Sequence, residues 1–289
     1  MLRRLTDLLK QLRSPPKPVP AGVPATHVAA VLAREPVAGW GDTHKRRVIV
    51  HYHFFKNAGT SLDETLREYF GERWVSVEGQ NSLSPADLAK LIADQPERAV
   101  FSSHTASFPV PDLEGVAIFP VVFVRHPIDR IRSVYEFERR QEPAVTRGAI
   151  VAKKRPFKGY VRWRLAADNQ IRNFHVTRFS RGEKGPPSLP SAIKYVDRLP
   201  FVGVVERFSD SLSLLQRHLN LAFPDIRLTE KHANVTRNRN GGIEQRLAAV
   251  RADLGPRLYD AVMEQNRDDL LLYEHVVERL AREIGREAA

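Results

Sequence analysis

The residues best suited to chemistry lie together in residues 51–66, where a β-branched and aromatic run gives way to small and polar side chains. This loop and the start of the next predicted helix contain Lys56, Asn57, Ala58, Gly59, Thr60 and Ser61. The N-terminus of a helix presents unpaired N–H groups and the positive end of the helix dipole, which together bind phosphate or sulfate. Gly59 and Ala58 allow the backbone to approach an anion closely, and Lys56 adds a compact positive charge. The stretch therefore predicts an anion-binding strand, loop and helix.

A second candidate site follows a buried strand further along the chain. Residues 119–124 form an almost continuous apolar run, typical of a strand covered on both faces, and Arg125 ends it. P-loop nucleotide hydrolases place a lysine after the second glycine of their loop and end a hydrophobic strand in an aspartate that helps to hold magnesium. Here the lysine precedes the glycine, and an arginine stands in place of the aspartate. We therefore expect an anion site without a metal ion, with a magnesium-dependent nucleotide kinase as the alternative enzyme.

Both segments resemble the sulfotransferases that use 3′-phosphoadenosine 5′-phosphosulfate (PAPS), in the bacterial, carbohydrate or heparan-sulfate type of branch. HFFKNAGTSL resembles the phosphosulfate loop of that family, and FVRHPIDRIRSVY resembles its second motif, in which a serine follows the arginine eight residues later. Weaker likeness continues in order over residues 47–275. The resemblance implies that the loop residues named above hold the 5′-phosphosulfate, and that Arg125 and Ser133 hold the 3′-phosphate. The chain departs from the family pattern at Phe55 and His126.

Sulfuryl transfer needs a base for the acceptor hydroxyl and cations for the charge that develops on the leaving phosphate. Among ten histidines, His104 directly follows a predicted strand at residues 99–102, at the edge where open α/β sheets bind ligands. The resemblance also implies a histidine base after this strand, so we predict Lys56 and His104 as catalytic residues. A structural histidine is the alternative for His104. On the first strand we expect one of His51 and His53 to face the site and the other to pack away.

Three further candidates are less specific. Arg237 is predicted to reach the cofactor from the loop before a Gly-Gly pair. Asn169 and Arg172 lie one helical turn apart, and either ligand contact or a plain helix surface fits them. Ser102 and Ser103 follow each other on a predicted strand, but they lack the G-x-S-x-G surroundings of a hydrolase nucleophile.

The elements that must position these residues alternate between strand and helix. This order predicts an α/β fold of the P-loop-NTPase-like type, in which helices flank a central, mostly parallel sheet in three layers. We expect strands at residues 48–52, 99–102, 119–124 and 201–205, and helices from Gly59, Pro85, Pro127 and Ser209, with residues 244–284 largely helical. Ser84 is predicted to cap the second of these helices with Asp87 at its third position, and Ser209 to cap the fourth.

The chain divides into an N-terminal segment, residues 1–43, and a sulfotransferase domain, residues 44–289. Residues 2–13 place leucines at helical spacing among basic residues, and a proline-rich linker follows. Such a basic amphipathic helix either contacts an anionic membrane surface peripherally or packs on its own domain. We find neither a secretory signal nor an apolar run of about 18 residues, and therefore expect a cytoplasmic protein.

Composition limits the partners. Lysine and arginine number 45 against 34 aspartate and glutamate, a net charge of +11 that favours anionic partners. Without cysteine, the chain has no disulfide, thiolate metal site or cysteine nucleophile. With the resemblance, we expect PAPS and a hydroxyl of a carbohydrate or glycolipid as partners, and no nucleic acid. The basic and aromatic residues 147–164 fit an acceptor surface or a solvated helix face, and a non-catalytic basic module remains a third hypothesis.

Overall fold

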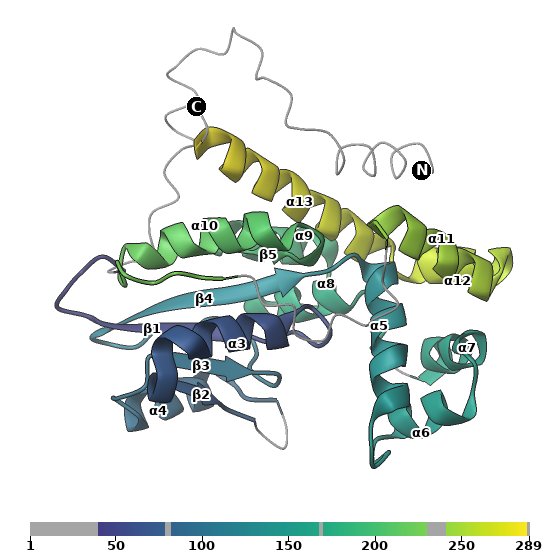
Figure 1. The fold of residues 1–289 in the computed structure, drawn as a ribbon, viewed down its shortest axis with the longest axis horizontal. Coiled ribbons are helices and arrows are strands. Elements are labelled where there is room, and N and C mark those ends of the chain that lie inside the picture. Colours follow the sequence, from purple (N-terminus) through teal and green to yellow (C-terminus); the bar gives the residue numbers. More distant parts are fainter. Residues whose placement is uncertain (1–39, 79–81, 168–169, 230–240, 288–289) are drawn as a thin grey trace, which may run out of the picture.

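A parallel sheet of five strands lies at the centre of the protein (Figure 1). The computed structural model describes residues 40–78, 82–167, 170–229 and 241–287. The strands are β1 (Arg46–Tyr52), β2 (Trp74–Ser76), β3 (Val100–Ser103), β4 (Val116–Val124) and β5 (Gly203–Val204), in the order β2-β3-β1-β4-β5. The helix expected at residues 2–13, and the candidates Asn169 and Arg237, lie outside the described residues.

The strand order reverses beside the central strand β1. β1 pairs with β3 on one side and with β4 on the other, so that Val50 lies opposite both Phe101 and Pro120. The chain leaves β1 towards β2 and leaves β4 towards β5, which lie at opposite edges of the sheet. In open α/β sheets ligands bind where neighbouring strands send the chain in opposite directions, at the carboxyl ends of those strands. The two predicted motifs follow these two strands.

Helices cover both faces of the sheet, which confirms the predicted three-layer α/β fold. The covering helices are α3 (Gly59–Phe70), α4 (Pro85–Asp94), α8 (Phe174–Phe179), α9 (Leu189–Arg198), α10 (Phe208–Asn220) and α13 (Arg267–Glu287). On one face, Phe119 of β4 contacts the ring of His218 from α10. On the other, Tyr52 of β1 stacks on Phe108, whose ring contacts Tyr195 of α9. Aromatic side chains thus fill both spaces between sheet and helices.

A second group of helices forms a separate buried cluster. These helices are α5 (Pro127–Arg140), α6 (Arg147–Lys154), α7 (Phe157–Ala167), α11 (Ile243–Leu254) and α12 (Pro256–Gln265). Their shared core includes Ile131, Tyr160 and Leu247. Because α5 starts three residues after β4 ends, it joins this cluster to the carboxyl edge of the sheet. In Figure 1 these helices lie beside the sheet rather than on its faces.

Most of the predicted elements are confirmed and two details are wrong. Ser84 and Asp87 form the predicted capping box, and the helix from Pro127 begins where it was expected. The strand at residues 201–205 is limited to Gly203–Val204, because the chain turns at once into a 3-10 helix (Val205–Arg207). Ser209 does not cap the next helix, since Arg207 takes the N-cap position. Two more 3-10 helices span Gly71–Arg73 and Ser180–Gly182.

The basic segment at residues 147–164 is partly core. It forms α6 and α7, and the aromatic rings of Phe157 and Tyr160 are buried in the second cluster. Arg164 is also buried, where it donates to Tyr160 and to a carboxylate oxygen of Glu138. Lys154, Lys158 and Arg162 are exposed. Within the described residues, none of the helices is long and apolar enough for a membrane span.

Candidate functional site

The loop between β1 and α3 has an unusual backbone. Lys56 and Ala58 take up left-handed conformations, with φ of 64° and 61°. Such angles are uncommon for residues other than glycine and persist only where the surrounding structure enforces them. Ala58 occupies the N-cap of α3 and has no side chain that can cap the helix. The first N–H groups of α3 therefore lack the usual capping acceptor, which suits an anion.

Lys56 lies among other cations. Its ammonium Nζ is 4.6 Å from the centroid of the Phe137 ring, on α5. Burial, together with repulsion from Arg125 and Arg140, lowers the pKa of Lys56 to about 8, and Glu136 offsets this only in part. A bound anion would relieve this repulsion.

Arg125 connects the two motifs. Its guanidinium donates to Asp129 Oδ2 from Nε at 2.7 Å and from Nη2 at 2.5 Å. Nη1 donates to the carbonyl oxygen of Lys56 at 3.2 Å. Asp129 is buried and also accepts from Arg246 Nε at 3.0 Å. Ser133, which the resemblance assigns to the same phosphate as Arg125, lies one turn beyond Asp129 on α5. In the structure Asp129 holds the guanidinium.

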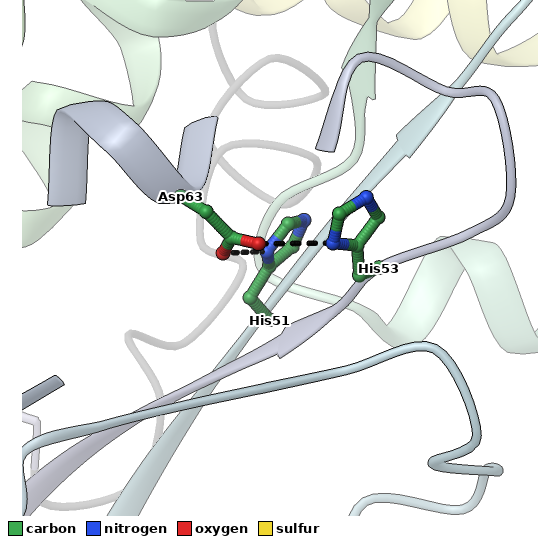
Figure 2. Close-up of side chains that lie close together, drawn as sticks. All are labelled: His51, His53 and Asp63. Carbon is green, nitrogen blue, oxygen red and sulfur yellow. Dashed lines mark hydrogen bonds and ion pairs between the residues drawn. The ribbon is translucent and has the colours of Figure 1, made fainter. Parts of the chain in front are cut away.

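Two histidines and an aspartate meet beside the loop (Figure 2). Nδ1 of His51 lies 2.8 Å from Asp63 Oδ1, and Nδ1 of His53 lies 2.9 Å from Asp63 Oδ2. The two rings are stacked with centroids 5.0 Å apart. The expectation that one of these histidines packs away is wrong, because residues two apart on a strand share a face. Asp63 comes from the first turns of α3 and was not anticipated.

His104 stands at the end of β3, next to this cluster. Its Nδ1 lies 2.9 Å from the carbonyl oxygen of His53, and its backbone N–H donates to Glu78 Oε1 at 3.1 Å. A carbonyl only accepts, so Nδ1 carries the proton and Nε2 holds the lone pair of the neutral ring. Partial burial and the neighbouring His53 ring lower the pKa of His104, which favours this neutral form. The exposed imidazole thus has the form that a general base requires.

Gly59 has a packing role that the sequence did not suggest. A β-carbon at this position would lie 2.0 Å from Cδ2 and 2.2 Å from Nε2 of His53. Real β-carbons do not approach other atoms this closely. The glycine therefore makes room for the imidazole of His53 at the first residue of α3.

Asn57 faces the protein interior. Its Oδ1 lies 3.0 Å from Nε2 of His175, and its Nδ2 donates to the carbonyl of Phe55 at 3.2 Å. His175 in turn lies 3.1 Å from Asp269 Oδ2 through Nδ1, and both side chains are buried. These contacts anchor the loop to α8 and α13. The side chain of Asn57 is thus engaged by the protein, whereas the resemblance implied a ligand contact.

The remaining candidates are placed as follows. Thr60 is exposed in the first turn of α3, and Ser61 in the same turn is buried. Arg172 is half-buried in the segment before α8. The structure thus brings Lys56, Arg125 and the histidines together at the carboxyl edge of the sheet.

These features define a three-layer α/β protein whose polar side chains gather where β1, β3 and β4 end. The chain is 36% identical over 247 residues to an uncharacterized protein of Archaeoglobus fulgidus. That match covers 81% of this chain and 97% of the archaeal protein. The chain therefore belongs to the same family as the archaeal protein. No family model matches the sequence.

Proposed function

We propose that the protein is a PAPS-dependent sulfotransferase that modifies a hydroxyl of a carbohydrate or glycolipid. The observation that carries the proposal is the position of Lys56, which lies partly buried in a left-handed loop beside Arg125 and Arg140. This group of cations at a helix N-terminus suits a phosphosulfate. The resemblance of the two motifs supports PAPS as the donor.

In this reaction the acceptor oxygen attacks sulfur and the bond between sulfur and the bridging oxygen of the 5′-phosphosulfate breaks. The first N–H groups of α3, with the hydroxyls of Thr60 and Ser61, hold the anion. Lys56 follows the negative charge as it moves onto the departing 5′-phosphate, which stabilises the transition state. The products are the sulfate ester and 3′,5′-adenosine bisphosphate.

His104 is the proposed base. Its Nε2 takes the proton of the acceptor hydroxyl while Nδ1 stays bound to the carbonyl of His53. Because burial favours the neutral imidazole, the ring is ready to accept a proton near neutral pH.

The 3′-phosphate is assigned to Arg125 and Ser133. In this assignment Arg125 keeps its hydrogen bonds to Asp129 and contacts the phosphate through Nη1. In the structure Nη1 donates to the carbonyl oxygen of Lys56. Asp129 thereby orients the guanidinium and also partly neutralises it. The contribution of Arg237 remains a prediction, as do the cytoplasmic location and the membrane contact of residues 2–13.

The helices next to the site favour an acidic acceptor. Lys154, Lys158 and Arg162 are exposed on α6 and α7, which pack against α5. Exposed cations of this kind raise the local concentration of anionic ligands.

Two assays test the proposal. Thermal shift should show stabilisation by 3′,5′-adenosine bisphosphate that exceeds the effect of ATP with magnesium, because a ligand that binds only the native state raises its stability. Transfer of labelled sulfate from PAPS to a panel of glycans should be lost in Lys56→Ala and in His104→Gln and kept in the control Lys90→Ala, at an exposed position of α4.

Other results would contradict the proposal. ATP turnover that a chelator stops would favour the kinase. Salt-sensitive binding of nucleic acid or anionic vesicles that survives Lys56→Ala, without bisphosphate binding, would favour the basic module. Full activity in His104→Gln would remove the base assignment alone.

A further inference from the structure

His51 of β1, His53 directly after it and Asp63 in the first turns of α3 build a compact set of metal-type ligands. One nitrogen of His51, one of His53 and a carboxylate oxygen of Asp63 all lie within 4.8 Å of one another. In Figure 2 both Nδ1 atoms point at the same carboxylate. Three side chains from two adjacent elements thus converge on one point, although two ordinary hydrogen bonds would also hold them there.

A fourth polar atom crowds this point. Ser102 Oγ, on the neighbouring strand β3, lies 3.0 Å from Nδ1 of His51, which is already 2.8 Å from Asp63. A ring nitrogen has either one proton or one lone pair, so it cannot make a linear hydrogen bond to both oxygens. His51 and Ser102 are each 1% exposed, so water does not readily satisfy the second contact. Nδ1 of His51 thus has two oxygen neighbours, where one hydrogen bond requires only one.

The charge states of Asp63 and His53 also suit a cation. The two histidines, as hydrogen-bond partners of Asp63, hold the pKa of that carboxyl well below its usual range, so the carboxylate is ionised. Burial lowers the pKa of His53, which keeps the imidazole neutral. Metal ligands must be deprotonated, and these two groups meet that condition near neutral pH.

The ligand types indicate which metal fits. Imidazole nitrogens suit zinc and neighbouring transition metals, whereas magnesium and calcium prefer oxygen ligands. Two histidines and one carboxylate with an open position are a common set for catalytic zinc. A shift of each ring to the tautomer protonated on Nε2 would free the Nδ1 lone pairs without net loss of a proton.

We propose that His51, His53 and Asp63 bind a divalent transition-metal ion, for which Zn²⁺ is the best match. This proposal departs from the expectation that the chain uses no metal. It does not rest on the sulfotransferase activity, because it follows from the ligand set alone. The site is separate from the magnesium site of a kinase, which would be built from oxygens.

The test measures metal binding directly. Protein produced without a polyhistidine tag is stripped with a chelator, loaded with equimolar Zn²⁺, desalted and analysed by elemental mass spectrometry. We expect about one zinc ion per chain. Titration with Co²⁺ should give a visible absorption band, and zinc should displace the cobalt.

Three variants locate the site. Asp63→Asn and His53→Asn should weaken zinc binding at least about 100-fold, since loss of a ligand costs more than loss of an outer partner. His275→Gln is the matched control, because His275 pairs with Asp197 at 2.8 Å elsewhere in the protein. It should bind zinc as the wild type does. Circular dichroism checks that each variant is folded.

Two outcomes would overturn the proposal. One is wild-type protein that retains no zinc after loading, which would leave a hydrogen-bonded cluster only. The other is a folded Asp63→Asn variant that retains as much zinc as His275→Gln. Neither outcome affects the binding of 3′,5′-adenosine bisphosphate, so failure here and failure of the sulfotransferase proposal are distinguishable.

Discussion

The imidazole of His53 occupies the space where a β-carbon on residue 59 would lie, 2.0 Å from its Cδ2. The ring cannot easily move aside, because Asp63 holds its Nδ1 at 2.9 Å. The glycine of the predicted anion loop and the histidine of the predicted strand are therefore one packing unit. Substitutions at either position should affect the other.

Gly59→Ala should destabilise the protein by about 1–3 kcal/mol, the usual cost of forcing extra volume into a packed site. Urea unfolding would measure the change. Gly41→Ala is the control, since Gly41 is exposed and no atom lies within 4 Å of an added β-carbon there. Adding His53→Ala to Gly59→Ala should recover part of the loss, and additive effects of the two substitutions would contradict the contact.

The affinity for 3′,5′-adenosine bisphosphate should decrease above about pH 8. The pKa of Lys56 is lowered to about 8, so the ammonium is charged below that pH and neutral above it. Loss of the charge removes attraction for the phosphate, with a limiting slope of about tenfold per pH unit. Calorimetric titration between pH 6.5 and 9.5 would follow it. Lys56→Arg keeps its charge throughout this range and should show no such decrease. The same pH profile of affinity in the wild type and in Lys56→Arg would show that the charge of Lys56 does not cause the decrease.

Substitution of Asn57 should lower both stability and ligand affinity, whereas substitution of Thr60 should lower affinity alone. Asn57→Ala leaves His175 Nε2 without its partner and should cost about 1–3 kcal/mol of stability, together with weaker bisphosphate binding. Thr60→Ala, at an exposed position, should change stability by less than about 0.5 kcal/mol while it weakens binding. Unfolding and binding measured on both variants decide the matter. Normal stability together with poor bisphosphate affinity in Asn57→Ala would show that the asparagine side chain contacts the ligand directly, as the resemblance implies.

Acid should destabilise the protein through His126. This side chain is fully buried, neither ring nitrogen has a hydrogen-bond partner among the described residues, and burial lowers its pKa to about 4. Between the ordinary pKa near 6.5 and pH 4, the unfolded chain binds a proton that the folded chain does not. Stability should therefore fall as the pH is lowered through this window, by up to roughly 3 kcal/mol from this residue.

Urea unfolding of the wild type and His126→Phe at several pH values isolates this contribution, because His53, His104 and His175 titrate in both proteins. The variant should lose less stability between pH 6.5 and 4. Parallel curves for the two proteins would show that His126 does not carry the effect.

The sequence predicted the layers of the fold and the loop, because the apolar runs and the glycine are local signals. The resemblance assigned Lys56 and Arg125 to two phosphates of one cofactor, and in the structure Arg125 Nη1 donates to the carbonyl oxygen of Lys56. The partners of these residues were missed for a physical reason. His175 reaches Asn57 across 118 positions, and no local pattern reports such a contact.

Two of the missed partners left a signal in the spacing. Asp129 follows Arg125 by four residues, which places the carboxylate in the first turn of a helix where it can reach back to the guanidinium. His53 directly follows β1 and still pairs with β3 through its N–H, so it shares a face with His51 two residues earlier. The two-residue repeat of an extended chain therefore predicts the paired histidines, although not the aspartate between them.

The two buried clusters give the chain two sets of positions that can change separately. Residues packed against β1 and β4 fix the loop between β1 and α3, so substitutions there alter the surroundings of Lys56 and the histidine cluster together. The helices that pack with α5 form their own core, and their exposed faces can be exchanged without touching the strands. On the proposed function, homologues that act on different acceptors should therefore differ mainly in α6, α7 and α12, because α11 supplies Arg246 to Asp129. Libraries that seek new acceptors can be confined to those three helices.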